Sequence, residues 1–209
     1  MKFEEIGSLE QLRSLYDLPM ELAVKKQRDK LDKFSIEFLE LSAFSILATS
    51  DAQGQMDCSP RGDHPGFIQL LDECTIALPD RPGNNRLDSL SNIISNPSVG
   101  LLVLIPGFKE CLRINGTARI VVNSELLERF EYQGKLPKSV IVISIREVYF
   151  HCAKAISRSK LWESDAKVDR NIMPSLGRII MNQIDPEKSE TEVKEVEDRI
   201  EERAKTTLY

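Results

Sequence analysis

Long apolar segments are missing from this sequence of 209 residues. The longest apolar run, residues 99–106, is far shorter than the roughly 20 residues that a membrane-spanning helix requires. The opening MKFEEIGSLEQL carries acidic side chains soon after Lys2 and no apolar core, so it does not resemble a secretory signal. We therefore expect a cytoplasmic protein with no membrane segment.

A positive net charge is also absent. The 28 Lys and Arg residues are outnumbered by 33 Asp and Glu residues, which gives a formal net charge of -5. Affinity for the phosphate backbone of DNA or RNA usually depends on a clustered excess of cations. The composition thus argues against a nucleic-acid partner, and any smaller anion that binds must be held by a local group of residues.

Residue types that bind metals are few. There are two histidines and four cysteines, and the cysteines lie far apart with no Cys-x-x-Cys pair: Cys58, Cys74, Cys111 and Cys152. Structural zinc sites need four closely arranged sulfur or nitrogen ligands, so we expect no metal site. Isolated cysteines in a reducing compartment pack as small apolar side chains, and we expect reduced thiols.

The pattern of apolar residues changes near residue 41. Before that point, Ser8 can cap a first helix, and Pro19 can open a second one that runs to residue 31. After it come short runs rich in β-branched residues, separated by turn residues, as in antiparallel sheets. We expect strands at residues 42–50, 55–60, 74–78, 99–105, 111–122 and 139–150, and short helices at 85–95 and 125–132.

These elements predict a mainly β (α+β) fold, with six antiparallel strands, short interposed helices and helical N- and C-terminal extensions. The expected divisions are an N-terminal helical extension at residues 1–37, a central domain at 38–165 and a charged helical extension at 166–209. Charged residues of both signs dominate the stretch between 185 and 205, which is typical of a helix that faces solvent or a partner.

Residues 79–86, PDRPGNNR, lie between an expected strand and an expected helix, where a phosphate group can be bound. Arg81 and Arg86 supply positive charge and planar donors. Asn84 or Asn85 can cap the helix or donate to the phosphate, beside the free amides of the helix start. This segment is therefore a candidate phosphate site.

The same segment has a simpler interpretation, in which it is an exposed loop whose arginines pair with Asp80 and Asp88. A second polar cluster, Ser59, Pro60 and Arg61, ends the second expected strand, where a turn of small neutral residues would be ordinary. Two arginine-containing segments next to the same sheet favour convergence on one ligand.

Three segments follow one another between residues 38 and 162: ILATSDAQGQMDCSPRGD, TIALPDRPGNNRLDSLSNIISNPSVGLLVLIPG and LRINGTARI. Together they combine an Ala-Thr-x-Asp-x-x-Gly hairpin, a short helix that ends in Asn-Pro and a Leu-Arg-Ile-Asn-Gly-x-Ala strand. This combination resembles the flavin-binding split β-barrel proteins related to pyridoxamine 5′-phosphate oxidase. The resemblance implies that the central domain is a six-stranded antiparallel split β-barrel.

The same resemblance implies a cofactor and an assembly. Proteins of that family hold flavin mononucleotide (FMN) in a groove between two subunits, so we expect FMN and a homodimer. By position, Ser59, Pro60 and Arg61 would line the isoalloxazine and ribityl region. The phosphate would be gripped by a second group: Arg81, Asn85 and Arg86.

Residues after the last expected strand would complete the pocket from the second subunit, by the same resemblance: Lys154, Arg158 and Trp162. Trp162 can stack near the flavin, but a single tryptophan is also a common core or interface residue. Lys154 can meet an anionic substrate or the flavin edge, and it can equally remain solvated.

The sequence departs from the pyridoxamine 5′-phosphate oxidases at its end, where KTTLY stands in place of an Arg-Leu-x-Pro signature that reads the substrate. The substrate is therefore an unidentified small molecule, and no catalytic residue is assigned. We expect an FMN-dependent oxidoreductase, because a bound flavin itself supplies the redox chemistry. The alternative is a non-enzymatic module that binds or stores flavin, a deazaflavin or haem.

Overall fold

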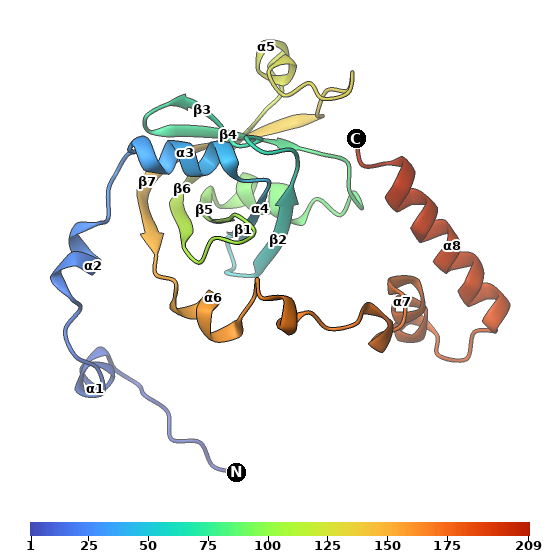
Figure 1. Cartoon of the computed structure of the whole chain (residues 1–209), viewed down its shortest axis with the longest axis horizontal. Coiled ribbons are helices and arrows are strands. Elements are labelled where there is room, and N and C mark those ends of the chain that lie inside the picture. The colour runs from blue at the N-terminus through green and yellow to red at the C-terminus, as the bar shows by residue number, and fades with distance from the viewer.

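Alternation of buried and exposed side chains from residue 44 onward produces one antiparallel sheet in the computed structural model, which describes residues 1–209 (Figure 1). Its seven strands are β1 (Phe44–Ser50), β2 (Met56–Gly62), β3 (Gln69–Asp72), β4 (Thr75–Asp80), β5 (Ser98–Leu104), β6 (Cys111–Val121) and β7 (Ser139–His151). They are ordered β2-β1-β5-β6-β7-β4-β3. The expected α+β class is confirmed, with β3 as a seventh strand beyond the six expected.

Eight α-helices accompany the sheet. They are α1 (Leu9–Ser14), α2 (Glu21–Lys25), α3 (Lys33–Leu41), α4 (Asp88–Ser95), α5 (Ser124–Glu128), α6 (Lys154–Ser159), α7 (Leu176–Ile184) and α8 (Glu190–Thr206). Figure 1 shows α3 and α4 against the sheet, α1 and α2 on one side and the α7–α8 hairpin on the other. None of the helices has both the length and the apolar character needed to span a membrane.

The first hairpin forms as the sequence predicts. The Asp51 side chain accepts hydrogen bonds from the amides of Gln53 and Gln55, and Gly54 adopts a φ of +84°, which a residue without Cβ adopts easily. Strand β2 then runs to Gly62, two residues beyond the expected end. Arg61 is consequently a strand residue paired with Ser45 of β1, and its side chain is held by the sheet.

The apolar core lies on one side of the curled sheet and is closed by α3. Phe38 and Leu39 of α3 join a cluster of 20 buried apolar residues that includes Leu47, Leu101 and Ile143. Strands β4 and β7 are buried on both faces, because Val140 and its neighbours pack beneath α5 in a second, smaller cluster. Burial on both faces explains the continuous apolar sequences of these two strands.

The N-terminal segment differs from expectation in one respect. Ser8 caps α1 by accepting from the amide of Gln11, as predicted, but α2 ends at Lys25 and does not reach residue 31. The helix stops because the backbone amide and carbonyl of Arg28 pair with Val148 of β7. That pairing draws the chain onto the sheet before α3 begins.

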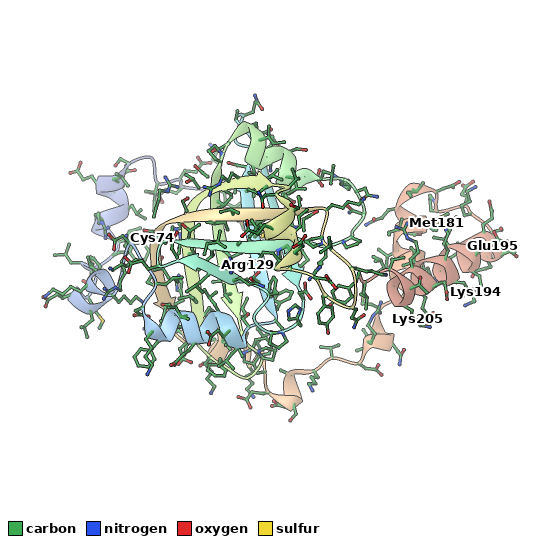
Figure 2. All side chains as sticks on the ribbon, turned by 90° about the horizontal axis from the view of Figure 1, so that it is seen from above. Cys74, Arg129, Met181, Lys194, Glu195 and Lys205 are labelled. Carbon is green, nitrogen blue, oxygen red and sulfur yellow. The ribbon has the colours of Figure 1, made fainter.

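The last two helices form a hairpin. Gly177 of α7 allows close packing, since a Cβ there would lie 2.8 Å from the Cα of Glu197 on α8. Arg178 bridges the two helices through Glu190 and Glu197. Figure 2 shows the hairpin projecting beside the sheet, with Lys194 on its outer part. Because α8 is charged on most of its surface, it presents the solvated helix that the sequence predicts.

A steric constraint explains the glycine in the expected Leu-Arg-Ile-Asn-Gly-x-Ala strand. The register between β6 and β7 shifts between Asn115 and Gly116, and a Cβ added to Gly116 would overlap the carbonyl oxygen of Ser144. A side chain is therefore excluded unless the two central strands of the sheet move apart.

We predict that Gly116→Ala lowers the free energy of unfolding by about 1–3 kcal/mol, through this overlap with Ser144. Chemical denaturation followed by circular dichroism measures the change. Gly83→Ala is the matched control, because a Cβ at Gly83 meets no atom within 4 Å. Equal stability of the two variants would show that the overlap does not constrain the sheet.

Candidate functional site

Two crossed ion pairs connect the arginine-containing segments. Arg61 of β2 donates to Asp80 of β4 over 2.8 Å, and Arg81 donates to Asp63 over 2.5 Å. Strands β2 and β4 are first and sixth in the sheet order and share no backbone ladder. Side chains at their ends can meet only because the sheet curls, so these pairs bridge the gap between distant strands.

The bridged segments surround a pocket of about 690 Å³. Its lining comes from the end of β2, the end of β4 with the loop that follows, and the first turn of α4. Five of the nine predicted site residues line the pocket: Ser59, Pro60, Arg61, Arg81 and Asn85. Six further polar or charged residues belong to the lining: Asp57, Asp80, Asn84, Asp88, Ser89 and Lys138. The fold thus brings the two segments to one pocket.

Asp63 is the buried centre of this arrangement. Its side chain has an exposed fraction of 0%. It accepts from Arg81, from the amide and the ring of His64, and from the Tyr209 hydroxyl. Burial disfavours the charged carboxylate, but these donors outweigh burial and lower the pKa of Asp63. Asp63 therefore stays ionised and holds Arg81 in place.

Arg81 has donors that no protein group accepts from. The exposed fraction of its side chain is 10%, and Nε is occupied by Asp63. Its Nη2 atom is buried without a hydrogen-bond partner, although the residue lines the pocket. A buried guanidinium nitrogen with no acceptor is costly in free energy, and an anion in the pocket would remove that cost.

The start of α4 is unusual in its backbone. Asn85 and Leu87 have φ values of +60° and +61°, and no side chain caps the helix, which begins at Asp88, three residues later than predicted. Left-handed conformations at residues other than glycine are costly and concentrate at ligand sites. Uncapped amides at a helix start bind anions well. Asn85 thus contributes backbone geometry rather than the side-chain cap that the sequence suggested.

A chain of side-chain hydrogen bonds fixes β2 against α4. Ser89 of α4 donates to Asp57 and lies 2.9 Å from the Ser59 hydroxyl, which in turn accepts from Nε of Arg61. The helix start therefore has a set position relative to Arg61. Sequence reasoning missed Asp57 and Ser89, since neither has a signal of its own before the pairing of β2 with α4 is known.

Sequence reasoning also missed Lys138. It lines the pocket and forms no ion pair, in contrast to both pocket arginines. It precedes Ser139, which the register of β4 and β7 places opposite Asp80. A basic residue directly before a long strand was visible in the sequence, but the strand pairing that brings it to the pocket was not.

Four predicted residues lie outside the pocket within one chain. Arg86 has a side chain with an exposed fraction of 72% and pairs with Asp88. That contact agrees with the simpler interpretation for Arg86, whereas Arg81 pairs with neither Asp80 nor Asp88. The other three follow β7: Lys154, Arg158 and Trp162. Trp162 donates to the carbonyl of Phe108 and packs beside α6.

The pocket contains no arrangement suited to a metal. No group of three or more His, Cys, Asp or Glu side chains is placed to hold an ion. All four cysteines are free thiols, and only Cys111 is buried. Burial raises the pKa of the Cys111 thiol, so it remains protonated. The side chains that line the pocket offer guanidinium, ammonium, hydroxyl, amide and carboxylate groups.

The sequence itself places the chain in a known family. Residues 31–152, more than half of the chain, match the family described as pyridoxamine 5′-phosphate oxidase. The chain belongs to this family, as its resemblance predicted. A search among curated proteins gave no match.

Solved structures with a similar fold come from several organisms. HupZ of Group A Streptococcus is 18% identical, covers 57% of this chain and 93% of its own, and has a TM-score of 0.47. A putative pyridoxamine 5′-phosphate oxidase from Lactobacillus delbrueckii is 20% identical, covers 58% and 95%, and has a TM-score of 0.45. An F420 reductase is 18% identical, covers 58% and 98%, and has a TM-score of 0.41. The family assignment rests on the sequence match.

We predict that Asp63→Asn lowers the free energy of unfolding by about 3 kcal/mol near neutral pH, because it leaves the buried Arg81 charge unpaired. The pKa of Asp63 is lowered in the folded protein. Its stabilising effect is therefore complete above the unfolded pKa of about 3.9 and is lost as the pH falls through the lower folded pKa.

Urea denaturation at several pH values measures this effect. The difference between the wild type and Asp63→Asn should be constant from neutral pH down to about pH 4 and should narrow below it. Asp17→Asn, at an exposed position near the N-terminus, is the control. A difference that stays unchanged down to pH 2 would contradict an ionised Asp63 as the source of the stability.

Proposed function

We propose that the pocket binds FMN and that the protein is an FMN-dependent oxidoreductase acting on a small molecule. One observation carries the proposal: Arg81, whose buried Nη2 has no partner, lines the same pocket as the uncapped start of α4. A guanidinium and free helix amides are the two groups that proteins most often combine to bind a terminal phosphate.

The dimensions and donors of the pocket fit such a ligand. A volume of about 690 Å³ lies within the range of roughly 300–1,000 Å³ that is usual for cofactor sites. Arg81, Asn85 and the first amides of α4 would hold the phosphate. Ser59, Pro60 and Arg61 on β2 would then flank the ribityl chain and the ring, because they continue the same wall of the pocket.

Arg86 has a separate part in the proposal. Its exposed side chain is held only by Asp88, which itself lines the pocket. A surface ion pair of this kind contributes about 0–1 kcal/mol, so the guanidinium is free to exchange Asp88 for a phosphate oxygen. Arg86 would therefore assist binding, and less strongly than Arg81.

FMN, when bound, supplies the redox chemistry of the proposed reaction. The residues of this chain bind and orient it, exclude water from its phosphate and place positive charge near its ring. Arg61 is the cation of the β2 wall that would flank the ring, and its ion pair with Asp80 fixes its orientation. The proposed role needs no acid–base pair of side chains.

The proposal includes a homodimer with a shared site. Lys154, Arg158 and Trp162 lie away from the pocket in their own chain, so they can complete a pocket only in a second copy. Exposed apolar side chains on α3, at the start of β2 and in the loop between β5 and β6 are suited to burial between two copies: Phe34, Leu41, Met56 and Phe108.

We predict that Arg81→Ala weakens FMN binding by about ten- to a hundredfold, since it removes a charge-assisted contact to the phosphate. Quenching of flavin fluorescence measures the affinity. Arg86→Ala should weaken binding less, and Arg13→Ala, on α1, should leave it unchanged. Riboflavin, which has no phosphate, should bind equally well to all four proteins. Unchanged FMN affinity in Arg81→Ala would show that the phosphate is held elsewhere.

The absorption spectrum of the purified protein tests the cofactor directly. We expect flavin bands, either after purification or after incubation with FMN. Reduced nicotinamide cofactors and a dye acceptor then separate an oxidoreductase from a binding or storage module, because only the enzyme turns over. A protein that stays colourless with FMN would rule out the proposed function.

A mixing experiment tests the shared site. We predict that Arg81→Ala and Arg158→Ala each weaken FMN binding when expressed alone. Co-expression with random pairing should restore wild-type affinity to about one quarter of the sites, because each mixed dimer has one intact site. Light scattering should give twice the mass of one chain. A monomer, or mixed protein without restored sites, would contradict the shared pocket.

A further inference from the structure

The chain returns to the pocket after α8. Tyr209, three residues beyond the end of that helix, lies against the loop that follows β4 (Figure 1). Its hydroxyl donates to Oδ1 of Asp63 over 2.9 Å, and its ring centroid is 5.3 Å from the guanidinium carbon of Arg81. One side chain thus touches both members of a buried ion pair.

Neighbouring residues hold Tyr209 in this position. Its ring lies 4.7 Å from that of Tyr132, which stacks on His64 at 4.5 Å with an interplanar angle of 8°. Lys135 donates to the main-chain oxygen of Tyr209 over 2.7 Å. These contacts form an aromatic cluster of three residues, His64, Tyr132 and Tyr209, and the Tyr209 ring packs against the Arg81 guanidinium.

The C-terminal segment that contains α7 and α8 is attached to the rest of the protein by few hydrogen bonds. Residues 168–209 form two hydrogen bonds to the rest of the protein, and both are made by Tyr209: one to Asp63 and one to Lys135. The α7–α8 hairpin packs on itself beside the sheet, with Lys205 at the end of α8 (Figure 2). The position of the whole segment next to the pocket therefore depends on Tyr209.

The hydrogen-bond geometry links Tyr209 to the free donor of Arg81. Oδ1 of Asp63 accepts from Tyr209 and His64, which leaves Oδ2 to accept from Nε of Arg81. The ring covers the guanidinium, so water has less access to it. Burial and the bond to Asp63 raise the pKa of the Tyr209 phenol, which keeps it protonated as a donor. Each contact restricts the orientation of Arg81.

We propose that Tyr209 is a positioning residue for Arg81: its hydroxyl fixes Asp63, and Asp63 in turn holds the guanidinium, whose Nη2 has no partner in the protein, at the pocket that would take the phosphate. This inference rests on the proposed binding of FMN. It makes the segment after α8 part of the anion site, although no residue of that segment lines the pocket. Because coupling is reciprocal, phosphate binding also stabilises the docked segment.

The test uses Tyr209→Phe in the full chain, because this change removes one hydroxyl and keeps the ring. We expect FMN affinity, measured by flavin fluorescence, to fall by about threefold to tenfold. Riboflavin affinity should not change. In an Arg81→Ala background, the Tyr209→Phe change should have no further effect on FMN, since the residue through which it acts is gone. Tyr16→Ala, at an exposed tyrosine far from the pocket, is the control.

Hydrogen–deuterium exchange supplies a second readout. FMN should slow exchange in the peptide that ends at Tyr209, and riboflavin should not, because only the phosphate reaches Arg81. In Tyr209→Phe this difference between the two flavins should shrink.

Three results would overturn the inference: an unchanged FMN affinity in Tyr209→Phe, an equal loss of riboflavin affinity, or the same loss in the Arg81→Ala background. These differ from failure of the proposed function, in which the wild type itself does not bind FMN. A wild type that binds FMN normally, with Tyr209→Phe unchanged, would therefore remove only the role of Tyr209.

Discussion

The crossed ion pairs between the ends of β2 and β4 are the constraint on which the site depends. The backbone ladder does not join these strands, so Arg61 with Asp80, and Asp63 with Arg81, set the distance between them. Each segment supplies one acid and one base. Neither arginine could remain in a largely buried position without the carboxylate from the opposite segment, because an unpaired buried charge is strongly destabilising.

Much of the fold could be predicted from local sequence. The Asp51 turn, the Ser8 cap and the presence of strands at β4 and β7 all depend on neighbouring residues, and the structure agrees with them. The short strand β3 was missed because its pairing with β4 includes a register shift and its apolar run is brief. The end of α2 was missed because Arg28 pairs with a residue 120 positions away.

Part of the candidate site could likewise be predicted from local sequence, and part could not. Arg61 and Arg81 could be found because charge beside a strand end is a local signal, and the family resemblance supplied their roles. Their actual partners could not be read from spacing: Arg81 avoids the adjacent Asp80 and pairs with Asp63. Lys138, Ser89 and Tyr209 reach the same region only through strand register and the return of the chain.

The lining of the pocket has a consequence for how a ligand arrives. Three acids, Asp57, Asp80 and Asp88, face three bases, Arg61, Arg81 and Lys138, so the charges cancel at a distance. Such a surface produces little field beyond the pocket, and an anion would not be steered towards it from bulk solvent. Added salt screens long-range attraction between charges, and the balanced pocket lining exerts little such attraction on an anion. The pocket lining therefore contributes little to the rate of association, and retention is determined by contacts made after entry.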